Sequence, residues 1–339
     1  MMSALDSFSK FCRKSAKIGR DITLIQATGG NTSLKQGDRL WIKASGTALA
    51  DAEIKSIFVS LDLPATLNAL TSDVDSALGR FVMSGEGLRP SIETPLHALL
   101  PHSVVLHVHS VAVLAWACRV DGQTALMSRL SGLNWAWIPY ARPGGALVEA
   151  VKNRLPEKPD ILVLANHGLV VAGNDVDIAF ALLHEVERRL ALPIRSAPPA
   201  NAERLMKAAQ ATGYEPALDA EAHAIALVAE RRAIAERGSL YPDHVVFLGA
   251  PVVWREAHAV SGSPSWLIIP DAGVLLKPCL STSAREMLRC LGLVLERIES
   301  DVPLAWLTCE DEAELLSWDA EKYRQQLSRQ TVGDTEIGM

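Results

Sequence analysis

Several features that mark specialised protein classes are scarce in this sequence. The 339 residues include only five cysteines and no Cys-x-x-Cys pair, so neither a disulfide framework nor a cysteine zinc site is expected. A basic excess is also missing, because 33 lysine and arginine residues face 39 aspartate and glutamate residues, a net charge of −6. Binding to a nucleic-acid backbone favours the opposite balance, so we expect no nucleic-acid partner.

Long apolar runs are missing as well. Runs such as residues 111–118 are far shorter than the roughly 18–20 residues that a membrane-spanning helix needs. Residues 1–20 mix charged side chains such as Asp6, Lys10 and Lys17 with apolar ones, which predicts an amphipathic helix rather than a signal peptide. We therefore expect no membrane contact and, because the cysteines are unpaired, a cytoplasmic location.

The chain does have enough apolar sequence for a substantial core, with 49% hydrophobic residues. In the first 190 residues, alternating and β-branched segments predict strands at residues 22–26, 32–35, 39–44, 104–108 and 161–164. Segments of helical length follow the last two of these, at residues 111–119 and 176–190. This mixture predicts an α/β fold or its α+β relative.

A stretch rich in proline and small residues, 193–202, predicts a linker. Beyond it, the sequence predicts helices at 202–211, 219–237 and 281–299, a strand at 245–248, and a strand-turn-strand at 266–277. We therefore expect two domains, a larger one over residues 1–195 and a smaller C-terminal α/β module of unknown role over residues 196–339.

Three histidines follow predicted strands in a pattern that suits a metal ion. His107 and His109 are spaced by two on one strand, which places both imidazoles on the same face. His167 follows the next β-branched run, at what we expect to be the end of a neighbouring strand. A single histidine on an apolar strand is more often a core residue, but three imidazoles form the open ligand set of a catalytic zinc. Manganese, cobalt or iron suit the same ligands.

Glu93 precedes a predicted helix in which Thr94 is the expected N-cap and Pro95 the first helical residue. A carboxylate at this place can ligate a metal or act as a general base. His97 lies one helical turn later, where it either orients Glu93 or packs in the core.

Two short turns rich in glycine and hydroxyl groups, residues 29–33 and 44–47, adjoin predicted strands. Such turns can offer N–H and hydroxyl donors to phosphate, although a Gly-Gly-Asn turn is more often just a hairpin. Neither matches a P-loop or a dinucleotide-binding fingerprint. Ser91 is a further candidate donor.

Five motifs occur in order along the chain: Gly30-Asn31-Thr32-Ser33, Ser45-Gly46, Ser91-Ile92-Glu93-Thr94-Pro95-Leu96-His97, His107-Val108-His109 and Asn166-His167-Gly168-Leu169. Together they resemble the class II aldolase and adducin family over about residues 5–190. That family includes fuculose-phosphate and rhamnulose-phosphate aldolases, ribulose-phosphate 4-epimerase and the non-catalytic adducin head. The second module makes the chain look most like the long aldolase domain of rhamnulose-phosphate type, and without a G-x-G-x-x-G stretch we expect no dehydrogenase domain.

The resemblance implies a three-layer α/β/α sandwich and an aldolase that cleaves a small ketose or ketose phosphate through a metal-stabilised enediolate. It implies that Glu93 is the catalytic acid/base. It implies that Zn²⁺, or another divalent ion such as Mn²⁺ or Co²⁺, is bound by His107, His109 and His167. It implies that a substrate phosphate contacts Asn31, Ser45, Gly46 and Ser91. Because family members are tetramers, a homo-oligomer is expected by resemblance.

The sequence also departs from the family pattern. Ile92 stands where short fuculose-type members have a second serine, which removes one phosphate donor. No motif identifies the family's catalytic tyrosine, although Tyr140 and Tyr241 are available. The alternatives are a sugar-phosphate epimerase or an oxo-acid-sugar decarboxylase using the same site, and an adducin-like scaffold without catalysis.

Overall fold

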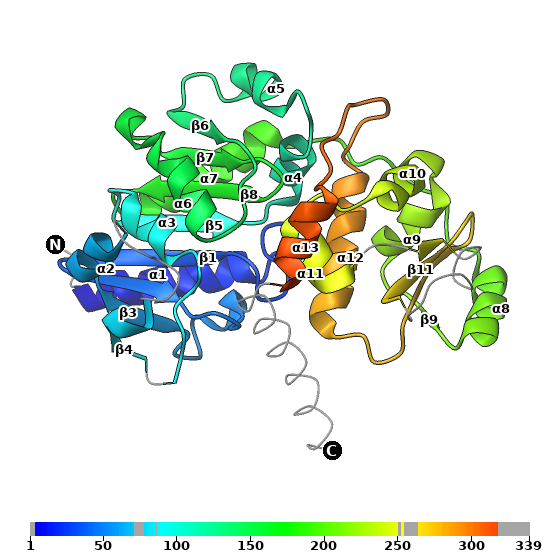
Figure 1. Ribbon diagram of the computed structural model, residues 1–339, viewed down its shortest axis with the longest axis horizontal. Helices are drawn as coiled ribbons and strands as arrows, with labels where there is room; N and C mark the ends of the chain where they lie inside the picture. Colours follow the sequence, from blue (N-terminus) through cyan, green and yellow to red (C-terminus); the bar gives the residue numbers. More distant parts are fainter. Residues whose placement is uncertain (1–3, 71–77, 86, 250–251, 254–263, 318–339) are drawn as a thin grey trace. The chain divides into compact units, whose positions relative to one another are not determined.

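The computed structural model describes residues 4–70, 78–85, 87–249, 252–253 and 264–317. These residues form two compact units, each built around its own β-sheet (Figure 1). The first unit contains the described residues up to 117 together with 122–191, and the second contains 118–121 and those from 192 onward. Among the described residues, no helix has the length and apolarity needed to cross a bilayer.

The sheet of the first unit has eight strands in the order β4-β3-β2-β1-β5-β8-β7-β6. Every neighbouring pair is antiparallel except β6 and β7. The strands are β1 Asn31–Gln36, β2 Arg39–Lys43, β3 Phe58–Asp62, β4 Val82–Ser84, β5 Val104–Val108, β6 Trp135–Ile138, β7 Ile161–Leu164 and β8 Gly168–Gly173.

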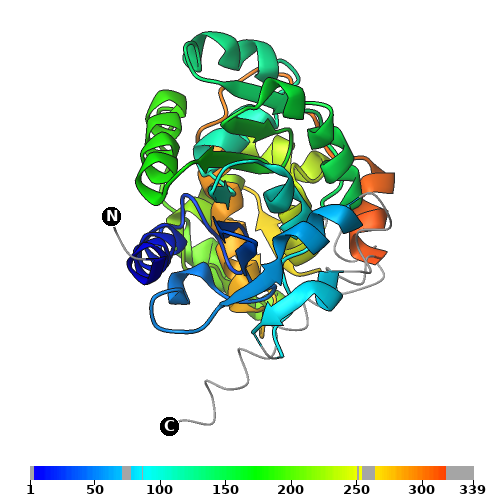
Figure 2. The same ribbon diagram turned by 90° about the vertical axis from the view of Figure 1, so that its left-hand side faces the viewer.

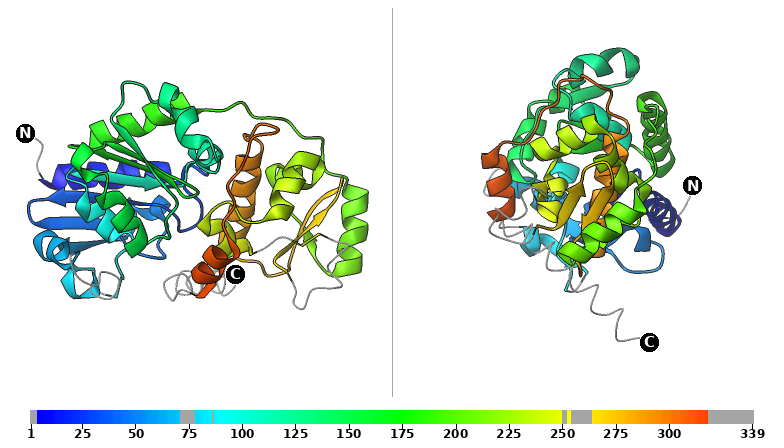
Figure 3. Two further views of the ribbon diagram at one scale, coloured as in Figure 1. Left: turned by 45° about the horizontal axis from the view of Figure 1, so that its top comes forward. Right: turned by 90° about the vertical axis from the view of Figure 1, so that its right-hand side faces the viewer.

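Helices cover both faces of this sheet, which confirms the three-layer sandwich (Figure 3). On one face, α3 and α6 pack against the strands through a shared apolar cluster. On the other face, α1 lies beside α7, as the blue and green helices of Figure 2 show. The helices of the unit are α1 Ala4–Gly19, α2 Leu63–Ala69, α3 Thr94–Leu99, α4 Val111–Ala117, α5 Gly122–Arg129, α6 Gly145–Lys152 and α7 Val176–Leu190, with 3₁₀ turns η1 Leu49–Asp51, η2 Leu78–Phe81 and η3 Leu155–Glu157.

Four of the five strands expected in the first 190 residues are confirmed, as β1, β2, β5 and β7. Both β5 and β7 are buried along their whole length, as continuous apolar runs are when helices cover both faces of a sheet. The strand expected at residues 22–26 is wrong. The Asp21 carboxylate accepts hydrogen bonds from the Thr23 amide and hydroxyl, and the Asp21 carbonyl accepts from Leu24 and Ile25, so this segment forms turns.

The second unit is the smaller α/β module, with a four-stranded sheet in the order β10-β11-β12-β9. Helix α8 packs on one face through the cluster that contains Leu205 and Ala209, and α9 contacts β11, β12 and α12. The elements are α8 Ala202–Thr212, β9 Glu215–Pro216, α9 Ala220–Leu227, α10 Ala229–Arg237, α11 Pro242–Leu248, β10 Val252–Val253, β11 Trp266–Ile269, β12 Gly273–Leu276, α12 Thr282–Leu295 and α13 Cys309–Ser317.

Two expectations for this unit are corrected. Residues 245–248 form the end of helix α11 and not a strand, because Pro242 occupies the first turn after the extended Tyr241 and starts a helix. The single helix expected over residues 219–237 is two helices, since Val228 adopts an extended conformation between α9 and α10. Short apolar runs such as 245–248 suit either a strand or a buried helix.

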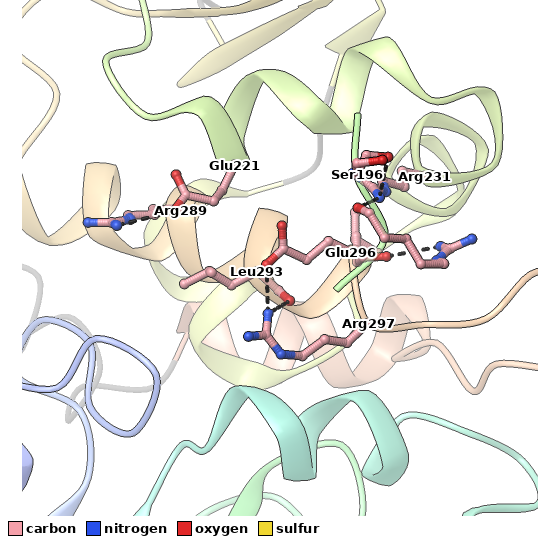
Figure 4. A network of polar contacts seen from close by, with 9 residues as sticks. Ser196, Glu221, Arg231, Arg289, Leu293, Glu296 and Arg297 are labelled. Atoms are coloured by element: carbon pink, nitrogen blue, oxygen red, sulfur yellow. Dashed lines mark hydrogen bonds and ion pairs between the residues drawn. The ribbon is translucent and has the colours of Figure 1, made fainter. Parts of the chain in front are cut away.

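Partly buried polar contacts join the start of the proline-rich linker to the rest of the second unit (Figure 4). The Arg231 guanidinium is 1% exposed and donates to the carbonyl oxygens of Arg195 and Ser196, while the Arg195 amide donates to the Glu296 carbonyl oxygen at 3.0 Å. Arg297 Nη1 donates to Glu296 Oε1 at 2.7 Å. The start of the linker is therefore an ordered part of this unit.

Candidate functional site

Strand pairing brings the three predicted histidine ligands together. His107 lies on β5 and His109 directly after it, while His167 lies in the turn between β7 and β8. The strand next to β5 is β8 and not β7, so the expectation that His167 ends a neighbouring strand is corrected. Because β8 starts beside Val108, the turn places His167 against the other two imidazoles. One ring nitrogen from each histidine can be chosen so that all three lie within 4.8 Å of one another.

The turn that carries His167 is unusually tight. Asn166 has φ 53° and Gly168 has φ 158°, both in the region that favours asparagine or glycine. A Cβ on Gly168 would lie 2.6 Å from the Val108 carbonyl oxygen. The Asn-His-Gly sequence therefore allows β8 to begin in direct contact with β5 and holds the imidazole over the strand end.

The distance between two of the histidines is compatible with a shared ion. His107 Nε2 and His109 Nε2 are 3.2 Å apart, close to the ~3.3 Å expected of two nitrogens bound at about 2.0–2.1 Å to one zinc ion. His107 Nδ1 lies 3.1 Å from the Leu169 carbonyl oxygen, which leaves Nε2 as the atom that faces the other rings.

A carboxylate from the start of helix α3, that of Glu93, lies beside the three histidines. Glu93 is the N-cap of α3, one residue earlier than expected, and its side chain is buried. Glu93 Oε1 lies 3.4 Å from His107 Nε2 and 3.5 Å from His167 Nε2, and makes no hydrogen bond within the described residues. A buried carboxylate oxygen without a hydrogen bond, facing three imidazoles, fits a site that takes a divalent cation.

The electrostatic surroundings keep Glu93 ionised. Burial by itself raises the pKa of this carboxyl, but the electrostatic influence of the neighbouring His107 and His167 and a hydrogen bond from Asn31 outweigh burial and lower the pKa to about 2. Asn31 Nδ2 donates to Glu93 Oε2 at 2.7 Å. At neutral pH, Glu93 is therefore in the form that accepts a proton.

Two of the four predicted phosphate-contacting residues, Asn31 and Ser91, contact Glu93, since Ser91 Oγ accepts a hydrogen bond from the Glu93 amide at 3.2 Å. Asn31 Nδ2 also lies within 3.2 Å of Ser91 Oγ. The Ser45 amide donates to the Arg89 carbonyl oxygen, and the Ser91 amide donates to the Lys43 carbonyl oxygen, so the turn with Ser45 and Gly46 lies against the segment with Ser91. Asn31 thus contacts Glu93 directly, a role that its place in the glycine turn did not indicate.

Lys43 belongs to this region and was not identified from the sequence. Its ammonium group is buried and donates to two carbonyl oxygens, that of Thr28, directly before the first glycine-containing turn, at 2.9 Å and that of Thr47, at the end of the second turn, at 2.8 Å. The available signal was a lysine that follows the apolar residues Leu40-Trp41-Ile42, directly before Ala44-Ser45-Gly46. A buried cation between the two turns raises the electrostatic potential where an anion is expected.

The remaining candidates have other surroundings. His97 is fully buried, with Nδ1 2.7 Å from Ser33 Oγ. Tyr140 lies in the loop between β6 and α6. Tyr241 is the N-cap of α11 in the second unit, where its hydroxyl donates to Cys290 Sγ at 3.7 Å and burial raises its pKa.

An alanine substitution at Gly30 tests how closely the turn at residues 29–33 approaches strand β5, which carries His107. A Cβ on Gly30 (φ 57°) would lie 2.8 Å from the His107 carbonyl oxygen and 2.4 Å from Ile25 Cδ1. Gly37 has the same φ with no atom within 4 Å. We expect Gly37→Ala to lower the free energy of unfolding by about 1 kcal/mol through backbone strain alone, and Gly30→Ala by roughly 1–3 kcal/mol more through the clash. Urea unfolding measures both, and equal losses would contradict the close approach.

Several known proteins are similar to this chain. Residues 11–193, more than half of the chain, match the family described as Class II Aldolase and Adducin N-terminal domain. An uncharacterised oxidoreductase of Bacillus subtilis is 28% identical over 196 residues, which are 52% of this chain and 28% of that protein. L-Fuculose phosphate aldolase of Methanocaldococcus jannaschii is 22% identical over 195 residues, which are 55% of this chain and 93% of that enzyme. The chain therefore matches less than a third of the Bacillus protein's length and most of the Methanocaldococcus enzyme's.

A solved structure is similar over the same part of the chain. It is the N-terminal class II aldolase domain of a conserved protein from Thermoplasma acidophilum, which is 29% identical to this chain. The match has a TM-score of 0.49 and covers 56% of this chain and 93% of that domain.

Proposed function

The chain belongs to the class II aldolase and adducin family, and from this we propose that it is a metal-dependent aldolase, a carbon-carbon lyase of the cytoplasm that cleaves a small ketose or ketose phosphate. One observation carries the proposal. The buried Glu93 carboxylate faces the ring nitrogens of His107 and His167 at 3.4 and 3.5 Å. A scaffold has no physical need to bury a carboxylate against three histidines.

The metal-binding residues in this proposal are His107, His109 and His167. Zinc suits three imidazoles best, and Mn²⁺ or Co²⁺ suit the same ligands. When bound, such an ion supplies Lewis acidity toward the carbonyl and hydroxyl oxygens of the substrate.

Glu93 moves the proton in this reaction. Its carboxylate accepts the proton of the substrate's C4 hydroxyl while the C3–C4 bond breaks, which releases an aldehyde. The electron pair of that bond stays on the ketone fragment, and Glu93 returns the proton to C3 of that fragment. Asn31 keeps the carboxylate in place through the bond to Oε2, so Oε1 is the oxygen that faces the reacting atoms.

An anionic group on the substrate is supported by the two glycine-containing turns. The turn with Ser45 and Gly46 lies against the segment with Ser91, and the side-chain hydroxyl groups of the two serines are the donors that we propose for a phosphate. Lys43 places a buried positive charge between the turns. These features favour a ketose phosphate over an unphosphorylated ketose, although Ile92 removes the second serine of short family members.

We also propose a domain organisation and an oligomeric state for the chain. Residues 1–195 form the catalytic domain, residues 196–339 form a module of unknown role, and the chain assembles as a homo-oligomer, a tetramer if it follows the family.

Product analysis tests the reaction. Protein loaded with zinc, manganese or cobalt is incubated with ketose 1-phosphates and with free ketoses, and the products are separated by mass and by chirality. We expect one aldehyde and one three-carbon ketone fragment per substrate cleaved. A single isomeric product would replace the aldolase by an epimerase, and release of CO₂ from an oxo-acid sugar would replace it by a decarboxylase. A chain that binds no added metal would favour the adducin-like scaffold.

A further inference from the structure

The face of β1 that carries Asn31 contacts α3 at three successive points. Asn31, Ser33 and Lys35 are spaced by two, so their side chains leave the same face of the strand. Asn31 Nδ2 donates to Glu93 Oε2 at 2.7 Å, Ser33 Oγ lies 2.7 Å from His97 Nδ1, and Lys35 Nζ donates to the carbonyl oxygens of Ala98 and Leu100. The first contact is at the N-cap of α3 and the last at its C-terminal end.

The spacing of strand and helix matches along this line. Two residues of a strand advance about 6.6 Å, and the four residues from Glu93 to His97 advance about 6.0 Å along a helix. Both segments run in the same direction, from Asn31 to Lys35 and from Glu93 to Leu100. Asn31 and Ser33 therefore meet Glu93 and His97 in register, and the long Lys35 side chain reaches the carbonyl oxygens at the end of the helix.

The contacts of Asn31 and Ser33 are buried, with Ser33 and His97 at 0% exposure and Glu93 at 6%, while those of Lys35 are partly buried. Helix α3 has only six residues, and its apolar contacts, through Leu96 and the adjoining Leu100, are non-directional. Apolar packing alone leaves so short a helix free to slide or turn. Directional bonds between buried partners penalise any displacement, because each broken bond leaves an unsatisfied polar group.

We propose that Ser33, His97 and Lys35 are positioning residues that fix α3 on β1 and so hold the Glu93 carboxylate against the histidines. This inference rests on the proposed function for its catalytic consequence, but its geometric content is independent of any reaction. A displacement of about 1 Å in a reacting group can lower a rate by about 100-fold. The contacts with Ser33 and Lys35 therefore act on the reaction through Glu93 alone.

The opposite face of β1 supplies a matched control. Ser15 Oγ on α1 lies 2.9 Å from Thr32 Oγ1, and both residues are fully buried. Ser15→Ala deletes a buried hydroxyl that bonds to Thr32 on β1, and Ser33→Ala deletes a buried hydroxyl of β1 that bonds to His97. Only Ser33→Ala removes a contact with α3. Lys35→Met removes the contact at the other end of the helix.

Crystal structures and steady-state kinetics of the metal-loaded variants test the proposal. In Ser33→Ala and Lys35→Met, we expect Glu93 Oε1 to move away from its wild-type distances of 3.4 and 3.5 Å to His107 and His167 by about 1 Å, with kcat lowered about 10- to 100-fold. In Ser15→Ala, we expect an unmoved Glu93 and a kcat within twofold of wild type. If one variant does not fold, the other carries the test.

The two readouts separate failure of this inference from failure of the proposed function. A Glu93 carboxylate that keeps its wild-type distances in both Ser33→Ala and Lys35→Met overturns the inference, whatever the rates. A displaced carboxylate in a protein that cleaves no ketose supports the positioning role and removes the lyase proposal. A displaced carboxylate with a wild-type kcat overturns the link between position and catalysis.

Discussion

Replacing Glu93 by glutamine is expected to lower kcat by about 100- to 10,000-fold, the usual contribution of a general acid/base, while the protein still binds its metal. Glutamine has nearly the same shape and can keep a contact with Asn31, but it cannot accept a proton. The three histidines are unchanged, so metal content measured by elemental analysis should stay near the wild-type value. The rate is measured on the substrate identified by product analysis.

Glu296→Gln is the control for this prediction. Glu296 is likewise a buried carboxylate, 8% exposed and bonded to Arg297, but it lies in the second unit. We expect its replacement to leave kcat within a fewfold of wild type. A Glu93→Gln enzyme that keeps a near-wild-type rate would remove Glu93 from the proposed mechanism.

Replacing His167 by asparagine is expected to remove both the metal and the activity. Two imidazoles, His107 and His109, remain, and two ligands hold a divalent ion far more weakly than three. Wild-type protein stripped with a chelator should regain activity when zinc, manganese or cobalt is restored, whereas His167→Asn should stay empty and inactive at the same metal concentrations. Elemental analysis after desalting measures the bound metal.

The control for this variant is His102→Asn. His102 is also buried, but its Nε2 lies 2.8 Å from Asp160 Oδ1, so it already has a partner of its own. We expect this variant to lose some stability and to keep about one metal per chain. Full metal content in His167→Asn would show that the ion is held elsewhere and would contradict the proposed ligand set.

Two of the strands predicted correctly from the sequence, β5 and β7, are largely apolar runs that are buried in the sheet. The run that became β7 is apolar throughout and the run that became β5 is apolar except for His107, and the structure buries both along their whole length. Residues 245–248 have a similar composition, yet they form a helix because Pro242 starts one just before them. An apolar run alone indicates burial, and its flanking residues decide between strand and helix.

The sequence by itself determined which chemical groups were available and their order along the chain. Histidines spaced by two on a strand share a face wherever that strand lies. Pro95 favours the first position of a helix, so Glu93 is expected near a helix start. Both inferences depend on local geometry, because residues so near in sequence have few possible arrangements. The family resemblance rested on the same local motifs.

Only the tertiary structure decided which of these groups meet. The sequence does not show that β8, rather than β7, pairs with β5, and this pairing is what places the turn with His167 beside His107. Likewise, the bond from Asn31 to Glu93 and the position of Lys43 between two turns join residues that are far apart along the chain. Pairings between distant segments depend on the free energy of the whole packed sheet, which no local pattern encodes.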